Sequence, residues 1–196
     1  MIFKQKVNYQ KIDGKKGRDC SERWNIITNF INENPESFSI DVGSAEGFFT
    51  KKIVEKSKGR VISIEGSDHV YSRQLKYCSE EINSGKVILV KMELTDKNID
   101  LFLDKKYESC LILSVLHWFD NPDFILKSLS NISKKVFIEL PELDDKKAWN
   151  QDYLKYISQN FNTLENYIEQ VSGKKIISEN KVSSHTSEFR RLFVLE

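Results

Sequence analysis

Apolar and polar residues alternate in blocks along the chain, and the spacing of the apolar residues predicts the order of helices and strands. The first block starts at Ser21 and has apolar residues at helical spacing, Trp24, Ile27, Phe30 and Ile31. It ends at Asn34-Pro35, because proline disfavours a continuing helix. A short strand over residues 38–42 then enters a glycine-containing turn, and helical spacing resumes over residues 48–54. The chain is therefore expected to open as helix, strand, turn and helix.

The same alternation repeats through the middle of the chain. Further strands are predicted over residues 60–65, 87–91, 109–114 and 135–140, with helices over 69–82, 98–103 and 123–132. Asn121-Pro122 provides a start signal for the last of these helices. The strands are apolar or β-branched nearly throughout, as strands buried on both faces are. Strands separated by helices predict a parallel sheet that is covered on both faces.

The end of the chain has a different character. A long helical segment is predicted over roughly residues 144–171, followed by strands over 174–179 and 189–195. The polar loop between these strands, with Ser183, Ser184 and Thr186, leaves no room for a helix. The two strands should therefore pair as an antiparallel hairpin at one edge of the sheet. The expected fold class is α/β, with three layers around a seven-stranded, mostly parallel sheet.

Length and charge refine this picture without changing it. A chain of 196 residues is sufficient for one ordinary core, so we expect a single domain over residues 21–196. A basic arm precedes it over residues 1–20, with Lys4, Lys6, Lys11, Lys15, Lys16 and Arg18. The net charge of +1 gives no global reason to expect nucleic-acid binding. The arm is expected to be a solvated terminus, and contact with phosphates is the alternative.

Other classes of protein are disfavoured by what the sequence contains. No apolar run approaches the length of a membrane span, and the first residues do not resemble a secretory signal, so a cytoplasmic location is expected. The three cysteines, Cys20, Cys78 and Cys110, form no C-x-x-C pair and have no histidine at ligand spacing. They predict neither a disulfide framework nor a zinc site.

The glycine turn after the first sheet strand is the most informative motif. It reads Asp41-Val42-Gly43-Ser44-Ala45-Glu46-Gly47. In open α/β sheets, ligands bind beyond the carboxyl ends of the strands where strand order reverses. Gly43 allows a ligand to approach the main chain, and Gly47 begins the next helix. The spacing is not G-x-G-x-x-G, and the acidic Asp41 and Glu46 would suit a cation better than a phosphate. These features favour S-adenosylmethionine, which carries a sulfonium, an ammonium and no phosphate.

A second acidic residue lies at the corresponding end of the next strand. Glu65 ends the strand over residues 60–65, immediately before Gly66. A carboxylate there is placed to accept two hydrogen bonds from a ribose diol, as in dinucleotide-binding folds. The glycine turn, the second carboxylate and the terminal hairpin together are more specific than any one of them.

With these motifs, the chain resembles the class I S-adenosylmethionine-dependent methyltransferases. The resemblance covers about residues 39–196 and depends on residues 40–49, Ile64-Glu65 and residues 113–118. It implies a Rossmann-like sheet of seven strands whose last two form the hairpin. Arg23-Trp24, followed by the glycine turn, is more narrowly similar to enzymes that methylate surface glycans or related small acceptors.

The resemblance also implies roles for individual residues. Asp41, Gly43 and Gly47 are expected to surround the methionine part of the cofactor, and Glu65 to hold the ribose. Met92 and Glu93 are expected to flank the adenine, with Asp96 as an alternative partner for its amino group. The full predicted cofactor-binding set is Asp41, Gly43, Ser44, Ala45, Gly47, Phe48, Glu65, Gly66, Met92, Glu93 and Ser114.

Methyl transfer is an in-line displacement that depends mostly on holding donor and acceptor in line, so no metal is required. An oxygen acceptor with a high pKa would need a base, and His117 follows the fourth sheet strand, where such a base is expected. The alternative is a hydrogen-bonded histidine that closes a loop. Trp118 is a candidate wall of the acceptor site.

Acidic residues near the fifth sheet strand are candidates for acceptor binding. Glu139 and Glu142 flank Leu140-Pro141 and are predicted either to hold an acceptor hydroxyl or amine, or to be solvated loop charges. His185, in the hairpin loop, is placed to overhang the acceptor, although loop polarity explains it equally well.

The sequence thus predicts an S-adenosylmethionine-dependent methyltransferase that O-methylates a small-molecule or sugar acceptor. One alternative is an RNA methyltransferase that uses the basic arm. Another is a non-catalytic relative that serves as a binding subunit. The glycine turn of such a relative is expected to be damaged, and here it is intact.

Overall fold

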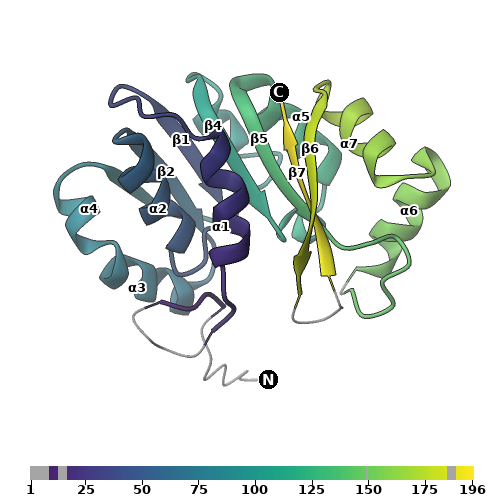
Figure 1. Ribbon diagram of the computed structural model, residues 1–196, viewed down its shortest axis with the longest axis horizontal. Helices are drawn as coiled ribbons and strands as arrows, with labels where there is room; N and C mark the ends of the chain where they lie inside the picture. The colour runs from purple at the N-terminus through teal and green to yellow at the C-terminus, as the bar shows by residue number, and fades with distance from the viewer. Residues whose placement is uncertain (1–8, 13–16, 149, 185–188) are drawn as a thin grey trace.

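The structure, a computed structural model, is built around one sheet with helices on both faces (Figure 1). It describes residues 9–12, 17–148, 150–184 and 189–196. The seven strands have the order β3-β2-β1-β4-β5-β7-β6. They are β1 (Phe38–Val42), β2 (Arg60–Glu65), β3 (Val87–Lys91), β4 (Tyr107–Leu113), β5 (Ser133–Leu140), β6 (Ile176–Ser183) and β7 (Phe189–Leu195). Strands β1 to β5 are parallel, and β7 runs antiparallel to both β5 and β6. The predicted fold class, including the antiparallel hairpin at one edge, is confirmed.

The helices form two layers with separate apolar cores. They are α1 (Ser21–Ile27), α2 (Phe48–Ser57), α3 (Asp68–Tyr77), α4 (Ser79–Asn83), α5 (Pro122–Ile132), α6 (Gln151–Phe161) and α7 (Leu164–Ser172). Short 3₁₀ helices cover η1 (Thr28–Phe30), η2 (Ile99–Phe102) and η3 (Leu116–Trp118). Helices α5, α6 and α7 share one cluster of buried residues with the sheet, whereas α1 and α2 share the other. Both faces of the central strands are therefore buried, which explains their nearly continuous apolar sequences.

Two predicted helices are each divided in the structure. The predicted helix over residues 69–82 is α3 followed by α4, with Cys78 between them. The predicted helix over residues 144–171 is α6 and α7, preceded by a loop. Asn162 has a φ of +65° and ends α6, and the side chain of Thr163 caps α7 by accepting a hydrogen bond from the Asn166 N–H. Periodicity does not detect a break of one or two residues when the apolar pattern continues across it.

Other boundaries also differ from expectation. The predicted helix over residues 98–103 is the short 3₁₀ helix η2. Strand β6 extends to Ser183, which therefore belongs to the strand rather than to the hairpin loop. By contrast, α5 begins as predicted at Asn121-Pro122, where the Asn121 side chain accepts a hydrogen bond from the Phe124 N–H at 3.3 Å.

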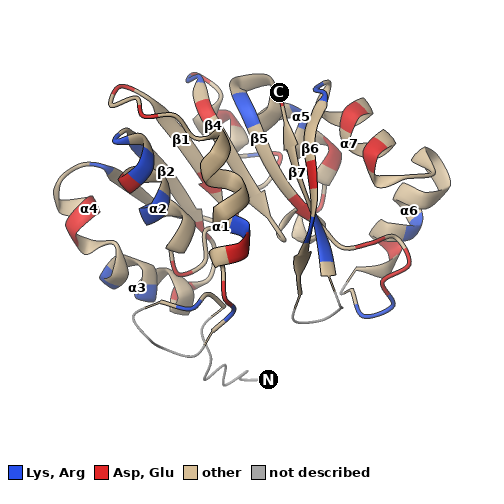
Figure 2. Cartoon of the chain, viewed as in Figure 1, with Lys and Arg blue, Asp and Glu red and all other residues tan. Residues whose placement is uncertain are grey.

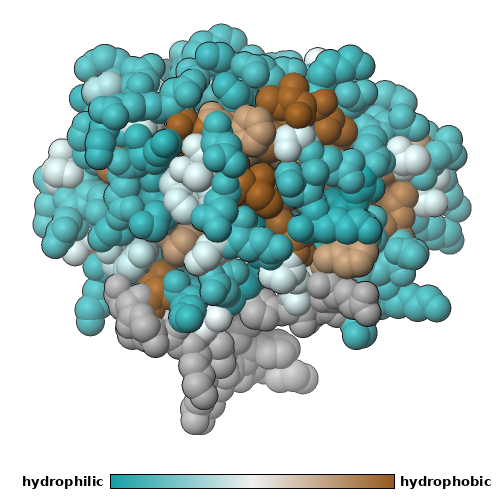
Figure 3. Space-filling model, in the orientation of Figure 1, coloured by the Kyte–Doolittle hydropathy of each residue, from teal (hydrophilic) through white to brown (hydrophobic). Residues whose placement is uncertain are grey.

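On the face that carries α1, charges of both signs are mixed among the described residues, and apolar residues form only separate patches (Figure 2 and Figure 3). Figure 2 shows Lys and Arg interspersed with Asp and Glu over the helices, in agreement with a net charge of +1. Figure 3 shows that the face carrying α1 is mostly hydrophilic, with hydrophobic residues in interrupted patches. In the described part of the chain, no helix is both long and apolar enough to cross a membrane.

The topology creates a site at the carboxyl end of β1. From β1 the chain continues to β2 and β3 on one side, and it later returns to place β4 on the other side. Val42, at the end of β1, pairs with Ile64 of β2 and Ile112 of β4. Strand order reverses here, so the loops after β1 and β4 diverge and leave a crevice between them.

Candidate functional site

A cavity of about 390 Å³ lies at this crevice. It is lined by residues from the ends of β1, β2, β4 and β5, from the segment after β3 and from the chain that precedes α1. It is large enough for a small organic ligand. Its position matches the ligand-binding site expected for an open α/β sheet.

The glycine turn wraps around the end of β2. The N–H groups of Gly43 and Ser44 donate to the carbonyl of Ile64 at 2.9 Å and 3.1 Å. Gly43 has a φ of +65°, and a Cβ there would lie 2.6 Å from Cγ2 of Val115. Position 43 therefore requires glycine for both conformation and space. Ala45 also has a positive φ, +53°, and its N–H donates to Oε2 of Glu65 at 3.0 Å.

Glu65 connects the glycine turn to the end of β2. In addition to the bond from Ala45, its Oε1 accepts a hydrogen bond from the Ser67 N–H at 2.8 Å. Burial raises the pKa of Glu65, and the two N–H groups oppose that rise. The carboxylate is therefore held in a fixed position at the edge of the cavity. Glu65 thus lies beside the glycine turn and lines the cavity, and its role in holding the ribose stays a prediction.

Asp41 is more deeply buried, with only 3% of its surface exposed. Its Oδ2 accepts a hydrogen bond from Oγ1 of Thr50 at 2.6 Å, and Thr50 contacts Oγ of Ser63 at 2.9 Å. Burial raises the pKa of Asp41 to about 7, and the charge of Glu65 adds to the rise. Among the groups that shift this pKa, none is basic. Asp41 thus lines the cavity as a carboxylate without a cationic partner among those groups.

Most of the predicted cofactor-binding residues line this cavity. These are Asp41, Gly43, Ala45, Glu65, Gly66, Met92, Glu93 and Ser114. Ser44, Gly47 and Phe48 do not, and neither does Asp96. Oγ of Ser44 donates to Oε1 of Gln74 at 2.9 Å, and a Cβ on Gly47 would meet Cys78 and Gln74. Within the turn, the residues that line the cavity are therefore Asp41, Val42, Gly43 and Ala45.

Glu46 does not have the expected position. It is 0% exposed and does not line the cavity, so the prediction that it would neighbour a bound cation is wrong. Its carboxylate accepts the N–H groups of Tyr9 and Gln10, both at 2.9 Å. It also forms an ion pair with Arg73 at 2.6 Å. Glu46 therefore attaches the chain before α1 to the glycine turn.

The described residues before α1, 9–12 and 17–20, form a segment that we call the N-terminal strap. In Figure 1 this segment runs below α3 and α1. Oε1 of Gln10 accepts the Phe48 N–H at 2.9 Å, and the Lys11 N–H donates to the Arg18 carbonyl at 2.8 Å. Tyr9, Gln10, Arg18 and Cys20 line the cavity. For these residues the expected solvated arm is wrong. Residues 1–8 and 13–16, with the other lysines of the arm, lie outside the described residues.

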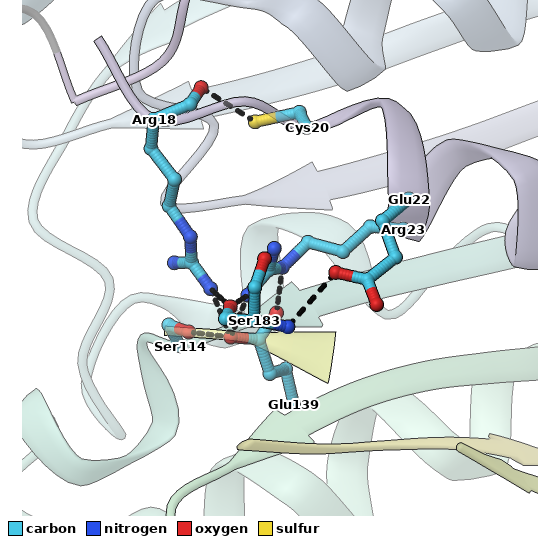
Figure 4. Close-up of polar contacts among 7 residues, drawn as sticks. All are labelled: Arg18, Cys20, Glu22, Arg23, Ser114, Glu139 and Ser183. Atoms are coloured by element: carbon cyan, nitrogen blue, oxygen red, sulfur yellow. Dashed lines mark hydrogen bonds and ion pairs between the residues drawn. The ribbon is translucent and has the colours of Figure 1, made fainter. Parts of the chain in front are cut away.

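Glu139 anchors the other end of the strap (Figure 4). It is 0% exposed, and its Oε1 accepts hydrogen bonds from Nη2 of Arg18 and Oγ of Ser114, both at 2.6 Å. Its Oε2 accepts from Nε of Arg23 at 2.6 Å. Both carboxylate oxygens thus accept hydrogen bonds from within the chain, although Glu139 lines the cavity, and its role in binding an acceptor hydroxyl or amine stays a prediction. Glu142 instead lies 3.8 Å from Arg191, away from the cavity lining.

His117 and Trp118 face different environments. Trp118 is 59% exposed and lines the cavity, and its role as a wall of the acceptor site stays a prediction. His117 is 6% exposed and is not among the lining residues. Burial, together with the charge of Arg190, lowers the pKa of His117 to about 4, so the imidazole is neutral at pH 7. This position gives no geometric support to a general-base role, which stays a prediction. His185 lies outside the described residues.

The sequence analysis missed the contribution of the strap and of Arg23. Arg23 is 1% exposed and shares a helix face with Cys20 and Ile27, which are also buried. A charged residue within an apolar helical stripe is a signal that could have identified it. The sequence does not show that the strap lies at the cavity, because the residues that hold its two ends, Glu46 and Glu139, are distant from it in sequence.

No family model matches the sequence, and no curated protein matches it. Solved structures with similar folds include WbdD in complex with the kinase inhibitor LY294002, with a TM-score of 0.77 and 20% sequence identity. This match covers 98% of the chain and 46% of that protein, so the chain spans less than half the length of WbdD. Another WbdD structure is described as a bifunctional kinase-methyltransferase and has a TM-score of 0.73.

Two other solved structures contain the cofactor or its product. Magnesium protoporphyrin IX methyltransferase from Synechocystis PCC 6803, with bound S-adenosylmethionine, has a TM-score of 0.62 and 14% identity over 90% of the chain and 76% of that protein. The N-terminal domain of EvdMO1, with bound S-adenosylhomocysteine, has a TM-score of 0.63 and 13% identity over 98% of the chain and 90% of that protein. The chain shares the fold of these methyltransferases.

Proposed function

We propose that the chain, which has the fold of the class I S-adenosylmethionine-dependent methyltransferases, binds S-adenosylmethionine and O-methylates a small-molecule or sugar acceptor. The observation that carries this proposal is the pair of carboxylates, Asp41 and Glu65, at neighbouring strand ends in one cavity. A carboxylate at the position of Glu65 also suits the ribose of a phosphate-bearing cofactor, so the discrimination comes from Asp41, whose carboxylate at the glycine turn would repel a pyrophosphate bound there. S-adenosylmethionine suits both carboxylates, because its cationic groups would be attracted to Asp41 and its ribose diol would donate hydrogen bonds to Glu65.

The residues around the cavity fit this cofactor. Asp41 is a buried carboxylate whose pKa is raised to about 7 without the influence of a basic residue, so a cationic ligand would stabilise its ionised form. Glu65 would accept hydrogen bonds from the ribose diol, because its position is held by the Ala45 and Ser67 N–H groups. Gly43 and Ala45 would border the methionine part, and Met92 and Glu93 the adenine.

The chain's own contribution to the reaction is mainly positioning. When bound, the cofactor supplies a methyl group on a positively charged sulfur. Ser114, Val115 and Trp118 border the cavity beyond the end of β4 and would form the acceptor side of the site. Holding the acceptor oxygen in line with the methyl group would provide much of the acceleration. The apolar side chains of Val115 and Trp118 would also exclude water from the donor.

The preference for a small acceptor is supported by the comparisons and by the charge of the chain. One matching protein is a magnesium protoporphyrin IX methyltransferase, and the EvdMO1 domain was also crystallised in the presence of D-fucose. The net charge of +1 provides little attraction for a polynucleotide.

Calorimetric titration tests the proposed cofactor. We expect S-adenosylmethionine and S-adenosylhomocysteine to bind in a 1:1 ratio and ATP, a nucleoside with phosphates, not to bind. A screen of small acceptors for release of S-adenosylhomocysteine would then test the transfer reaction. Tighter binding of ATP than of S-adenosylmethionine would contradict the proposal.

Substitution of Glu65 tests the assignment to the ribose. Glu65→Gln should weaken S-adenosylhomocysteine binding by about 10- to 100-fold, because hydrogen bonds to a charged group are lost. The same substitution should have little effect on a 2′,3′-dideoxy analogue, which lacks the diol. Glu36→Gln, at an exposed glutamate outside the cavity lining, is the matched control. An equal loss for both ligands would mean that Glu65 only supports the turn.

A further inference from the structure

The two arginines that line the cavity lie on the opposite side from three of its acidic residues. Asp41 and Glu65 lie at the ends of β1 and β2, and Glu93 follows β3. Arg18 and Arg23 line the opposite side, beside β5. The exposed Asp120 lines the rim after β4. The cavity is thus acidic where the proposed cofactor lies and carries its lining arginines where the acceptor would enter.

Glu139 neutralises only part of the charge on the arginine side. It carries one negative charge and contacts two guanidinium groups, those of Arg18 and Arg23 (Figure 4). The three side chains therefore retain one positive charge. Arg190, which is 6% exposed, adds another nearby, because the charge of Arg18 lowers its pKa and that of Glu139 raises it. Asp145 also raises the pKa of Arg190 and compensates part of that second charge.

Hydrogen-bond donors also remain on these arginines. Nη2 of Arg23 donates to Glu139 at 3.1 Å and also to the carbonyl of Ser183. Nη1 of Arg23 and Nε of Arg18 are buried and have no partner among the described residues. Arg23 is 1% exposed, so water does not readily reach its guanidinium. Leaving a buried donor without an acceptor is unfavourable. Because both arginines line the cavity, a ligand bound there is placed to supply the missing acceptor.

Building on the proposed function, we propose that Arg18 and Arg23 form a subsite for an oxyanion of the acceptor molecule, a carboxylate or a phosphoryl group. An oxyanion bound there would accept hydrogen bonds from both guanidinium groups, which suit such groups in geometry and charge. It would lie at the β5 side of the cavity, next to Ser114 and close to the proposed methyl-transfer region. The acceptor is therefore an anionic small molecule or an acidic sugar.

A purely structural role for the cluster is the alternative. In that case the arginines would only attach the strap and α1 to β5 through Glu139. Such a clamp requires no leftover charge, and one arginine opposite one glutamate would be sufficient. Two arginines with unpaired buried donors fit a binding site better than a completed clamp.

Paired ligands that differ only in charge test the subsite. Glucose 6-phosphate and glucuronate are titrated against glucose, with inorganic phosphate and acetate as minimal probes, into the full chain saturated with S-adenosylhomocysteine. We expect the two charged sugars to bind at least about tenfold more tightly than glucose. The ratio between glucose 6-phosphate and glucuronate then distinguishes a phosphoryl from a carboxylate preference.

Substitutions of Arg18 assign the effect to the cluster. Arg18 is partly exposed, at 19% of its side chain, so it tolerates substitution better than Arg23. Arg18→Gln should remove most of the preference for the charged sugars, and Arg18→Lys should restore part of it. In both variants, affinity for S-adenosylhomocysteine should change less than affinity for the charged sugars. Arg60→Gln, at the exposed start of β2, is the matched control.

The outcomes separate this inference from the proposed function. If S-adenosylhomocysteine binds but charged and neutral sugars bind equally, the subsite is wrong and the function stands. The same holds if Arg18→Gln leaves the preference intact. If S-adenosylhomocysteine does not bind, the proposed function fails. In that case inorganic phosphate is titrated into the full chain and into Arg18→Gln without S-adenosylhomocysteine, and equal binding to both would overturn the subsite.

Discussion

At the scale of single residues, Asp41 reduces stability in order to provide a binding group. Its carboxyl is buried, and its pKa is raised from 3.8 to about 7 in the folded chain. Between about pH 4 and pH 7 the folded state therefore binds a proton that the unfolded state has released. Stability from this group falls as the pH rises through that range and stays lower above it.

Asp41→Asn should therefore stabilise the chain most at alkaline pH. Asparagine can still accept the hydrogen bond from Thr50, but it has no charge to desolvate. We expect the free energy of unfolding to rise at pH 8 and to change less at pH 5, with a difference of up to about 3 kcal/mol between the two gains. Urea denaturation at both pH values measures it. Asp100→Asn, at an exposed aspartate, is the control. A gain that is independent of pH would contradict the assigned pKa.

The positions of Asp41 and Glu65 were predictable from the sequence because each lies at the end of an easily recognised strand. Register then brings both to the same edge of a parallel sheet. Ser44, Gly47 and Phe48 do not line the cavity, which the sequence could not show, because the direction of a side chain in a turn depends on its φ and ψ angles. Arg18 lines the cavity only because Glu46 and Glu139 hold the strap there. Such long-range pairings between charged residues leave no local pattern.

At the scale of elements, the strap is held by side chains more than by its own structure. Glu46 accepts two N–H groups of the strap and is fully buried, so it has no water to replace a lost partner. Glu46→Gln presents an amide N–H₂ group where one acceptor oxygen was. We expect the fraction of molecules with a detached strap to rise by about 10- to 100-fold, because hydrogen bonds to a charged group are lost.

Limited proteolysis measures this detachment. Trypsin should cleave after Lys11 and Arg18 at least several times faster in Glu46→Gln than in the unsubstituted chain, and saturating S-adenosylhomocysteine should slow both cleavages. Glu55→Gln, at an exposed glutamate of α2, is the control because it removes the same charge without contacting the strap. Equal cleavage rates in the two variants would show that Glu46 does not hold the strap.

A network of hydrogen bonds between tyrosines and Asp123 connects helices α5, α6 and α7. The Tyr153 hydroxyl donates to that of Tyr167 at 2.9 Å, and Tyr167 donates to Asp123 at 2.8 Å. Tyr167→Phe leaves the buried Tyr153 hydroxyl without its acceptor, and should lower the free energy of unfolding by about 1–3 kcal/mol. Tyr156 is 39% exposed, and its hydroxyl also donates to Asp123. Tyr156→Phe should therefore lower the free energy of unfolding by less than Tyr167→Phe does. Urea denaturation compares them, and an equal cost would contradict the role of burial.

At the scale of the whole molecule, the sheet was the most predictable feature. Strands buried on both faces are apolar throughout, and the alternation with helices restricts the connections to parallel crossovers. The insertion of β7 between β5 and β6 follows from the hairpin and the antiparallel pairing of its strands. The division of the C-terminal helical segment was not predictable from periodicity, because the break depends on Asn162 and Thr163 alone.

The cavity joins distant parts of this sheet, so a ligand in it should stabilise the molecule as one unit. Its lining runs from Tyr9 in the strap to Glu139 in β5. At 100 times its dissociation constant, S-adenosylhomocysteine should add about 2.7 kcal/mol to the free energy of unfolding. For a chain of this size, that raises the Tm by roughly 5–10 °C.

The shift at equal ligand concentration should be larger at pH 8 than at pH 6, because an ionised Asp41 attracts the ammonium. In Asp41→Asn the shift should be smaller and nearly independent of pH. Differential scanning calorimetry with and without the ligand measures both, and a pH dependence that survives in Asp41→Asn would assign the attraction to another carboxylate.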